Sequence, residues 1–234
     1  MKDLFVAGCS DIAEAGFPNV MCSVVFLEGC NFKCPYCLNA KLVTRKNNNK
    51  IPIDDVINKY KEEDKILISG GEPLCNERIY DFIYKLKNSG FSVRISTNGS
   101  FPEILYKLVG DKLVSFVAMD VKTGFHDLKK WDVVSNQDNI HSRIIESIGI
   151  LNKKNVDYEF RTTLFPGLVE EGDIVSIAHK IHKDSNWFLQ QFRPNKKLLG
   201  GNSVSNIKPY KEETLQKFIN IARQNVKNTR IRDV

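Results

Sequence analysis

Six short apolar runs alternate with helix-like segments along the chain. The runs are rich in Val, Ile, Leu and Phe, and they fall at residues 24–27, 66–69, 92–96, 113–120, 157–164 and 187–192. Runs of this length that are apolar at consecutive positions are typical of strands buried on both faces of a parallel sheet. We therefore predict six parallel strands.

Three other segments carry apolar residues at the spacing i, i+3, i+4, i+7 of an amphipathic helix. The positions are Ile79, Phe82, Ile83 and Leu86; Ile174, Ile177, Ala178 and Ile181; and Leu215, Phe218, Ile219 and Ala222. Alternation of strands and helices favours a parallel sheet with right-handed crossovers and helices outside. Six such units predict an α/β fold, an open partial (β/α)6 barrel of the TIM type.

Length and composition predict one domain. A chain of 234 residues, 42% hydrophobic, supports one sizeable core and is short for two. We expect an N-terminal extension at 1–22, the barrel at 23–193, and a loop and C-terminal helix at 194–234 that complete the same domain. Within the last part, residues 194–209 form a loop that either covers the barrel mouth, meets a partner, or is an ordinary surface loop. Residues 211–234 indicate an amphipathic helix followed by a basic tail.

Charge and hydropathy exclude some function classes. The chain has 34 Lys and Arg against 28 Asp and Glu, a net charge of +6 that is spread without blocks of like charge. This pattern does not favour a nucleic-acid partner. No apolar stretch follows a basic N-terminus, and none approaches the length that spans a bilayer. We expect a cytoplasmic chain without a membrane partner.

Three of the six cysteines stand close together, directly after the first predicted strand. Cys30, Cys34 and Cys37 have the spacing C-x3-C-x2-C. In a reducing compartment, clustered cysteines bind metal or react more often than they form disulfides. Ordinary structural zinc sites and fully thiolate-ligated [4Fe–4S] clusters need four protein ligands. Three thiolates therefore indicate a cluster with one iron open to a substrate or cofactor.

The remaining cysteines show no second tight spacing, so we predict no auxiliary cluster. Cys9, Cys22 and Cys75 are each expected to be buried as small hydrophobic residues. An alternative of a different class stays open, in which Cys22 or Cys75 supplies a fourth ligand and the chain is a non-catalytic metal-binding module.

Residues 30–37, with an aromatic residue before the last cysteine, resemble the cluster loop of radical S-adenosylmethionine (SAM) enzymes. The Gly-Gly-Glu-Pro segment at 70–73 resembles the turn with which these enzymes hold the methionyl amino group. The resemblance implies a [4Fe–4S] cluster on the three cysteines and SAM at the open iron. It implies that the 70–73 turn contacts SAM and not the cluster, so that changes in the turn spare the iron.

The same resemblance assigns further cofactor contacts to residues at the carboxyl ends of the predicted strands. The full set of cofactor-binding candidates is Tyr36, Gly70, Gly71, Glu72, Pro73, Ser96, Thr97, Asn98, Asp120, Lys122, Arg161 and Gln191. In parallel α/β barrels the chemistry gathers at this end of the strands, so one shared site is expected. For Arg161, the residues alone leave open a pairing with the SAM carboxylate or ribose and a salt bridge at the barrel rim.

Other segments narrow the resemblance to activases of glycyl radical enzymes. Residues 26–31, 117–122 and 160–168 resemble that group, and residues 189–194 resemble its branch that activates anaerobic ribonucleoside-triphosphate reductase. The implied partners are that reductase and a low-potential electron donor such as flavodoxin or ferredoxin. A radical SAM enzyme acting on another glycyl radical enzyme or on a peptide is the alternative.

Two positions depart from the activase pattern. Ser96 stands where activases often have Asp, which weakens the case for a monovalent-cation site shared with Asp120. Leu38 and Asn39 stand where His-Asn is common, so redox tuning or partner contact near the cluster differs.

Overall fold

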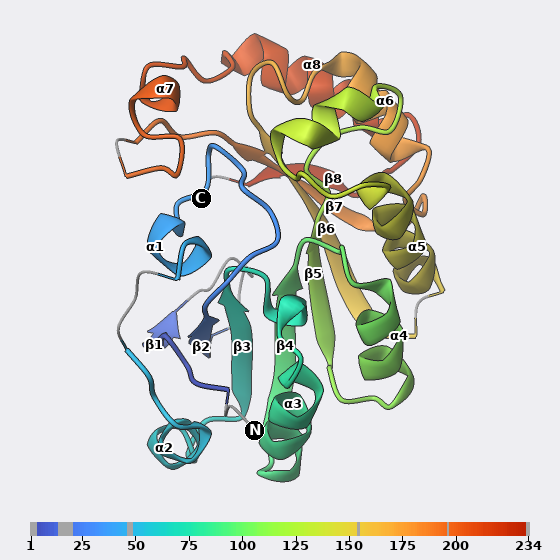
Figure 1. Cartoon of the computed structure of the whole chain (residues 1–234). Helices are drawn as coiled ribbons and strands as arrows, with labels where there is room; N and C mark the ends of the chain where they lie inside the picture. Colours follow the sequence, from blue (N-terminus) through green and yellow to red (C-terminus); the bar gives the residue numbers. More distant parts are fainter. Residues whose placement is uncertain (1–3, 14–20, 46–48, 154, 196, 233–234) are drawn as a thin grey trace.

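The structure, a computed structural model, describes residues 4–13, 21–45, 49–153, 155–195 and 197–232. One eight-stranded sheet runs through these residues in sequence order (Figure 1). Its strands are β1 (Gly8–Ala13), β2 (Cys22–Leu27), β3 (Lys65–Gly70), β4 (Ser92–Thr97), β5 (Phe116–Asp120), β6 (Asp157–Leu164), β7 (Asn186–Gln191) and β8 (Thr229–Arg232). The β1–β2 pair is antiparallel and every other pair is parallel. β1 and β8 are the two edges, so the sheet is an open barrel, as predicted.

The six predicted strands are β2 to β7, and their bounds differ from the predicted ones by a few residues. The largest difference is at β5, which begins at Phe116 and not at residue 113. β1 and β8 were missed. β1 lies in the predicted extension 1–22, whose residues 1–3 and 14–20 are outside the described part; β8 occupies the predicted basic tail. Both are edge strands, since β1 pairs only with β2 and β8 only with β7.

The prediction that every strand is buried on both faces is wrong for β4 and β6. Burial alternates along β4, where Val93, Ile95 and Thr97 are buried and the residues between them are partly exposed. The end of β6 alternates in the same way. An open barrel explains this pattern, because the outer face packs against helices while the inner face lines a cavity.

Helices connect the parallel strands and lie outside the sheet (Figure 1). They are α1 (Ala40–Val43), α2 (Ile53–Lys59), α3 (Ile79–Asn88), α4 (Pro102–Gly110), α5 (Ile140–Asn152), α6 (Glu171–Ala178), α7 (Asn202–Ser205) and α8 (Glu212–Arg223), with 3-10 turns η1 (Pro73–Cys75) and η2 (Leu128–Val133). The three predicted helices are α3, α6 and α8. Of the predicted helix positions, only Ile181 lies outside these helices: it is buried, but it follows the end of α6. No helix of the described residues combines the length and apolar character that crossing a bilayer requires.

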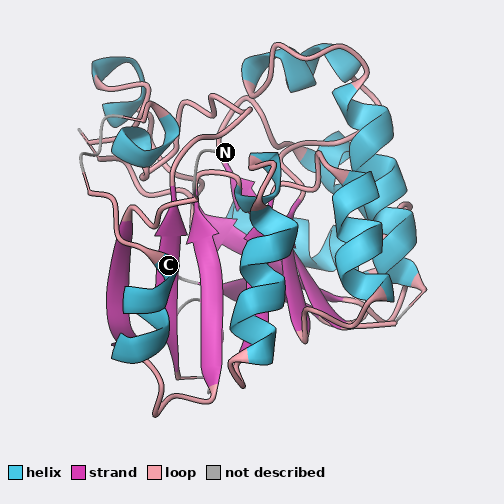
Figure 2. Ribbon diagram, turned by 60° about the horizontal axis from the view of Figure 1, so that its bottom comes forward, coloured by secondary structure: helices cyan, strands magenta, loops and turns pink. Residues whose placement is uncertain are grey.

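The carboxyl ends of the parallel strands point toward the end of the sheet where the long loops gather (Figure 2). The segment that follows β2 contains all three clustered cysteines. We call residues 29–39 the cysteine loop. The fold therefore brings this loop beside the turns that follow β3 and β4.

A buried ion pair holds β8 in the sheet. Arg232 donates two hydrogen bonds to the Glu159 carboxylate, at 2.7 and 2.9 Å, and both side chains are less than 10% exposed. The Arg232 guanidinium also lies 3.5 Å from the centre of the Phe188 ring on the strand between them. The pair therefore links β6 and β8 across β7.

We expect Arg232→Met to lower the free energy of unfolding by about 3–5 kcal/mol, because it leaves the Glu159 carboxylate buried without its cation. Arg230→Met is the matched control, since Arg230 is exposed on the same strand and its replacement should change stability by less than about 0.5 kcal/mol. Urea unfolding under anaerobic conditions measures both. Equal stability of the two variants would show that β8 does not depend on the ion pair.

Candidate functional site

A cavity of about 500 Å³ lies at the carboxyl ends of the strands. Its lining contains all three clustered cysteines and nearly all of the predicted cofactor-binding residues. Those present are Cys30, Cys34, Tyr36, Cys37, Gly70, Gly71, Glu72, Ser96, Thr97, Asn98, Asp120, Lys122, Arg161 and Gln191. Pro73 is the exception, since it is buried in η1 behind the turn. Residues that are up to 161 positions apart in the sequence therefore share one cavity.

The three thiols face this cavity without forming a single-ion site. Within the described residues, no group of three or more Cys, His, Asp or Glu side chains is close enough to hold one metal ion. Ligands at three corners of an iron–sulfur cube stand farther apart than ligands of one ion. Three soft donors around one large cavity therefore fit a cluster better than a zinc ion.

Burial keeps the free thiols protonated. It raises the pKa of Cys34 to about 11, and it also raises the pKa of Cys30 and Cys37. The nearby Lys122 ammonium partly offsets the effect at Cys34. Because thiolates are the ligands, metal binding must displace these protons.

The turn after β3 packs backbone against backbone with the start of the cysteine loop. Gly71 N donates to Leu27 O at 2.9 Å, and Glu72 N donates to Gly29 O at 2.8 Å. A Cβ on Gly71 would lie 2.0 Å from the Gly29 oxygen, and Gly70 has a φ of +120°. Glycine is required here by the cysteine loop itself. A side chain at Gly71 would therefore displace the start of the cysteine loop, so a change at this position should also disturb the iron site.

Glu72 connects the turn after β3 to the turn after β4. Its buried carboxylate accepts hydrogen bonds from Leu74 N (3.0 Å), Thr97 Oγ1 (2.7 Å) and Asn98 N (2.5 Å). Burial raises the pKa of this carboxyl to about 7, although the three donors lower it. These bonds give Glu72 a positioning role between the two turns, and its role beside the SAM ammonium stays a prediction.

Asparagine side chains tie the cysteine loop to its neighbours. Asn39 donates to Gly70 O at 2.9 Å, and Asn31 donates to Ser100 and Gln137, each at 2.8 Å. Asn98 donates in turn to the Asn31 oxygen. Sequence reasoning missed Asn31, Ser100 and Gln137, since no spacing relates them. Only the position of Asn31 beside a cysteine could have drawn attention to it.

The loop at 194–209 also contacts the cysteine loop. Leu199 N donates to Cys37 O at 2.9 Å, and Gly200 N donates to Pro35 O at 2.8 Å. A Cβ on Gly200 would approach Pro35 O to 3.0 Å. This part of the segment is therefore fixed to the cysteine loop by backbone hydrogen bonds.

Three charged residues form an ion-paired group on the cavity wall. Arg161 Nε lies 2.9 Å from Asp120 Oδ1, and Lys122 Nζ lies 3.1 Å from Asp120 Oδ2. Burial alone would raise the pKa of Asp120, but the two cations outweigh it and lower that pKa. Both readings of Arg161 are compatible with this geometry, since it makes a salt bridge and lines the cavity. The group carries two cations and one anion.

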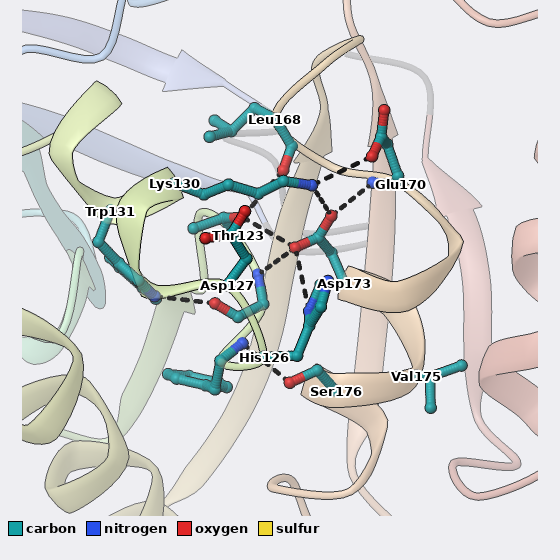
Figure 3. Close-up of polar contacts among 12 residues, drawn as sticks. Thr123, His126, Asp127, Lys130, Trp131, Leu168, Glu170, Asp173, Val175 and Ser176 are labelled. Carbon is teal, nitrogen blue, oxygen red and sulfur yellow. Dashed lines mark hydrogen bonds and ion pairs between the residues drawn. The ribbon is translucent and has the colours of Figure 1, made fainter.

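A polar network around Asp173 fixes the loop that follows β5 and contains Lys122 (Figure 3). The buried Asp173 carboxylate accepts from Thr123 Oγ1, Gly124 N and Glu170 N, and Lys130 Nζ lies 2.6 Å from it. Farther along this loop, Val134 O accepts from the backbone of the cysteine loop at Lys33. The network thus stabilises another support of the cysteine loop.

Tyr36 and Phe192 line the cavity, and the Phe165 ring packs against both of them. The Tyr36 and Phe165 ring centres are 5.0 Å apart, as are those of Phe165 and Phe192. Trp131 and Trp187 are fully buried packing residues, as expected. None of the four histidines lines the cavity.

The other three cysteines lie away from the two described cavities that border the cysteine loop. Cys22 is buried in an apolar cluster with Val24, Leu67 and Ala118. It begins β2 whereas Cys30 follows the opposite end, so they are separated by roughly 16 Å of strand. Cys9 and Cys75 are partly buried. The structure therefore gives no support to Cys22 as a fourth ligand.

Comparison with known proteins identifies clear relatives. The model of the radical SAM superfamily matches residues 24–179. A Methanocaldococcus jannaschii protein, named by inference as a glycyl-radical enzyme activating enzyme, is 34% identical over 100% of this chain and 98% of its own length. A second protein of that organism with the same kind of name is 31% identical over 69% of this chain and 62% of its own. Streptococcus suis SuiB bound to S-adenosylmethionine shares the fold, with a TM-score of 0.61 at 16% identity, over 90% of this chain and 51% of that one.

Serine at position 30, 34 or 37 should abolish retention of a [4Fe–4S] cluster after anaerobic reconstitution, because each change removes one of only three thiolates. Cys9→Ser is the control and should keep full iron content. Iron and sulfide analysis with the visible absorption spectrum measures the result. Full iron in any of the three variants would show that the ligand assignment is wrong.

Replacing Gly71 with Ala should lower iron content and SAM affinity together, since the added Cβ displaces the start of the cysteine loop. We expect SAM to bind at least about tenfold more weakly, ~1.4 kcal/mol. Gly149→Ala is the control, because Gly149 lies on α5 with nothing within 4 Å of an added Cβ. Equilibrium SAM binding and iron analysis test this; normal iron with weak SAM binding would contradict the coupling.

Proposed function

The chain belongs to the radical SAM superfamily, and from this premise we propose that it installs a glycyl radical on a partner enzyme, the anaerobic ribonucleoside-triphosphate reductase. The single observation that carries the proposal is the shared cavity, which brings three thiols, the glycine turn and the Asp120 ion-paired group together. The names of the two Methanocaldococcus relatives support an activase.

The residues present fit the cofactors of this family. Cys30, Cys34 and Cys37 would hold a [4Fe–4S] cluster through three irons, which leaves the fourth for the amine and carboxylate of SAM. When bound, these groups supply one-electron cleavage of SAM to methionine and a 5′-deoxyadenosyl radical. The chain has to hold both groups and keep other reactants away.

Paired charges on the cavity wall suit a zwitterionic ligand. Asp120 offers an acceptor to an ammonium group, and Lys122 and Arg161 offer donors to a carboxylate or to ribose hydroxyls. Because these groups already hold each other in place, little reorganisation is needed when the ligand binds. Glu72 accepts hydrogen bonds from Thr97 and Asn98 and so holds them in place to contact the same zwitterionic ligand.

The open barrel suits a macromolecular substrate. A radical that abstracts hydrogen must be kept from water and from the protein's own side chains, so the target C–H bond has to be held close by. A glycine segment of the partner entering the cavity beside Tyr36 and Phe192 would complete the enclosure. The chain's part would be to hold the Cα–H bond of that glycine beside bound SAM, whose cleavage would supply the acceptor for the hydrogen atom.

The choice of reductase as the partner rests on sequence segments. Residues 117–122 and 160–168 resemble the activase group, and residues 189–194 resemble its reductase-activating branch. Together these segments contribute Asp120, Lys122, Arg161 and Gln191 to the cavity. Another glycyl radical enzyme or a peptide would use the same chemistry, so the substrate is decided by the experiment.

Incubation of the reconstituted chain with SAM, a reductant and the anaerobic reductase of its own organism should produce a glycyl radical, seen as a doublet by electron paramagnetic resonance. Cys34→Ser is the negative control, since it lacks a cluster ligand. Robust SAM cleavage with no radical on the reductase, but modification of another glycyl radical enzyme or a peptide, would transfer the proposal to that substrate. No SAM cleavage at all would reject radical SAM activity.

A further inference from the structure

Three polar side chains close a ring of hydrogen bonds beside Cys30. Asn31 Nδ2 donates to Ser100 Oγ at 2.8 Å, Ser100 Oγ donates to Asn98 Oδ1 at 2.5 Å, and Asn98 Nδ2 donates to Asn31 Oδ1 at 3.0 Å. Asn98 and Ser100 are buried, and Asn31 is partly buried. The proposed function gives this ring no role.

One backbone group sets the direction of the whole ring. Ser100 N donates to Asn98 Oδ1 at 2.9 Å, and because a backbone N–H can only donate, the Asn98 amide has to present its oxygen here. The Asn98 nitrogen therefore faces Asn31, whose oxygen accepts and whose nitrogen is left to donate to Ser100 Oγ. Every bond points the same way around the ring, so each bond polarises and strengthens the next.

The turn after β4 holds one side of the ring in a fixed position. Two bonds reach this turn from α5, since Arg143 Nε donates to Ser100 O and Ser147 Oγ donates to Gly99 O, each at 2.7 Å. The backbone of the turn also donates to the buried Glu72 carboxylate. The turn is therefore held by α5 on one side and by the turn after β3 on the other.

The other side of the ring is next to the Cys30 thiol. Phe32 N donates to Cys30 Sγ at 3.3 Å, and the Phe32 side chain is buried. Asn31 lies between these two residues in the chain, and its side chain is bonded to both other members of the ring. A displacement of Asn31 would therefore move the Cys30 sulfur relative to the turn after β4.

We propose that the ring of Asn31, Asn98 and Ser100 sets the position of the proposed cluster relative to bound SAM, so that Asn31 and Ser100 are positioning residues for SAM cleavage. The inference rests on the proposed function. Cys30 would fix one corner of the cluster, whereas the turns after β3 and β4, which line the same cavity, would hold SAM. Bond cleavage depends steeply on the separation of the reacting groups, and a misplacement of about 1 Å can cost about 100-fold in rate.

The ring differs from the glycine contact between the two turns in what its loss removes. Opening the ring at Ser100 leaves Asn31 bonded to the exposed Gln137, and it leaves Asn98 Oδ1 bonded to the backbone of the turn. The three thiols and the backbone bonds of the cysteine loop also remain. Loss of the ring should therefore change the rate of SAM cleavage and not the iron content.

The test uses the reconstituted chain with Ser100→Ala, with Asn31→Ala and with both changes. Gln137→Ala is the matched control, because it removes a hydrogen bond of Asn31 that lies outside the ring. Each variant is reduced with dithionite under anaerobic conditions. The measurements are iron content, equilibrium SAM binding, the rate of SAM cleavage per cluster, and the electron paramagnetic resonance spectrum of the reduced cluster with and without SAM.

We expect each single variant in the ring to keep full iron and to bind SAM within about threefold of the wild type, but to cleave it about tenfold more slowly per cluster. The double variant should be no slower than the single variants, because the ring is already open in each of them. The spectrum of the reduced cluster should match that of the wild type without SAM and differ from it with SAM. The control should behave like the wild type in every measurement.

Wild-type cleavage rates together with wild-type spectra in the presence of SAM would overturn the proposal. Slower cleavage that only follows lost iron would also overturn it, since the ring would then have a structural role alone. So would single effects that multiply in the double variant, which would show two independent bonds. The spectra need neither turnover nor the reductase, so a chain that cleaves no SAM or forms no glycyl radical rejects the proposed function, while the spectra still decide the role of the ring.

Discussion

The close backbone contact between the turn after β3 and the start of the cysteine loop is the constraint on which the site depends. Gly71 and Gly29 approach so closely that neither turn can move without the other, and two backbone hydrogen bonds fix their register. Glu72 extends the same connection to the turn after β4 through a buried carboxylate. The end of β2, the end of β3 and the end of β4 therefore act as one rigid unit, which places the thiols relative to the cavity.

The buried charges on the cavity wall beside this unit are paired. Isolated charges at such buried positions would be costly, and the structure meets that cost by placing Lys122 and Arg161 on either side of Asp120. At Cys34 and Cys37, Lys122 offsets the effect of burial only in part, so the thiol pKa stays raised and a metal has to replace the protons. The chain thus carries an ordered set of charges for a polar ligand and a set of neutral thiols that only a metal converts to ligands.

The cysteine loop has little regular structure of its own, and its conformation comes from distant segments. Backbone groups of Val134, Leu199 and Gly200 bond to it from two later parts of the chain. Asn31 adds a side-chain connection to Ser100 and Gln137. A loop supported in this way keeps its thiols at the cavity although it contains no strand and no helix of its own.

The sequence by itself determined the six parallel strands, the three amphipathic helices and the two motifs that meet at the cavity, because strand and helix periodicities are local and the cysteine and Gly-Gly-Glu-Pro motifs are contiguous. It could not determine β1 and β8, since an edge strand such as 229–232 is defined by its partner and by the buried pair of Arg232 with Glu159. Nor could the sequence show that Gly71 and Glu72 hold neighbouring turns together, since the resemblance of their motif assigns them only to contacts with SAM. Only the tertiary structure decided that they join neighbouring turns, because hydrogen bonds and close approach depend on which backbones the sheet brings into contact.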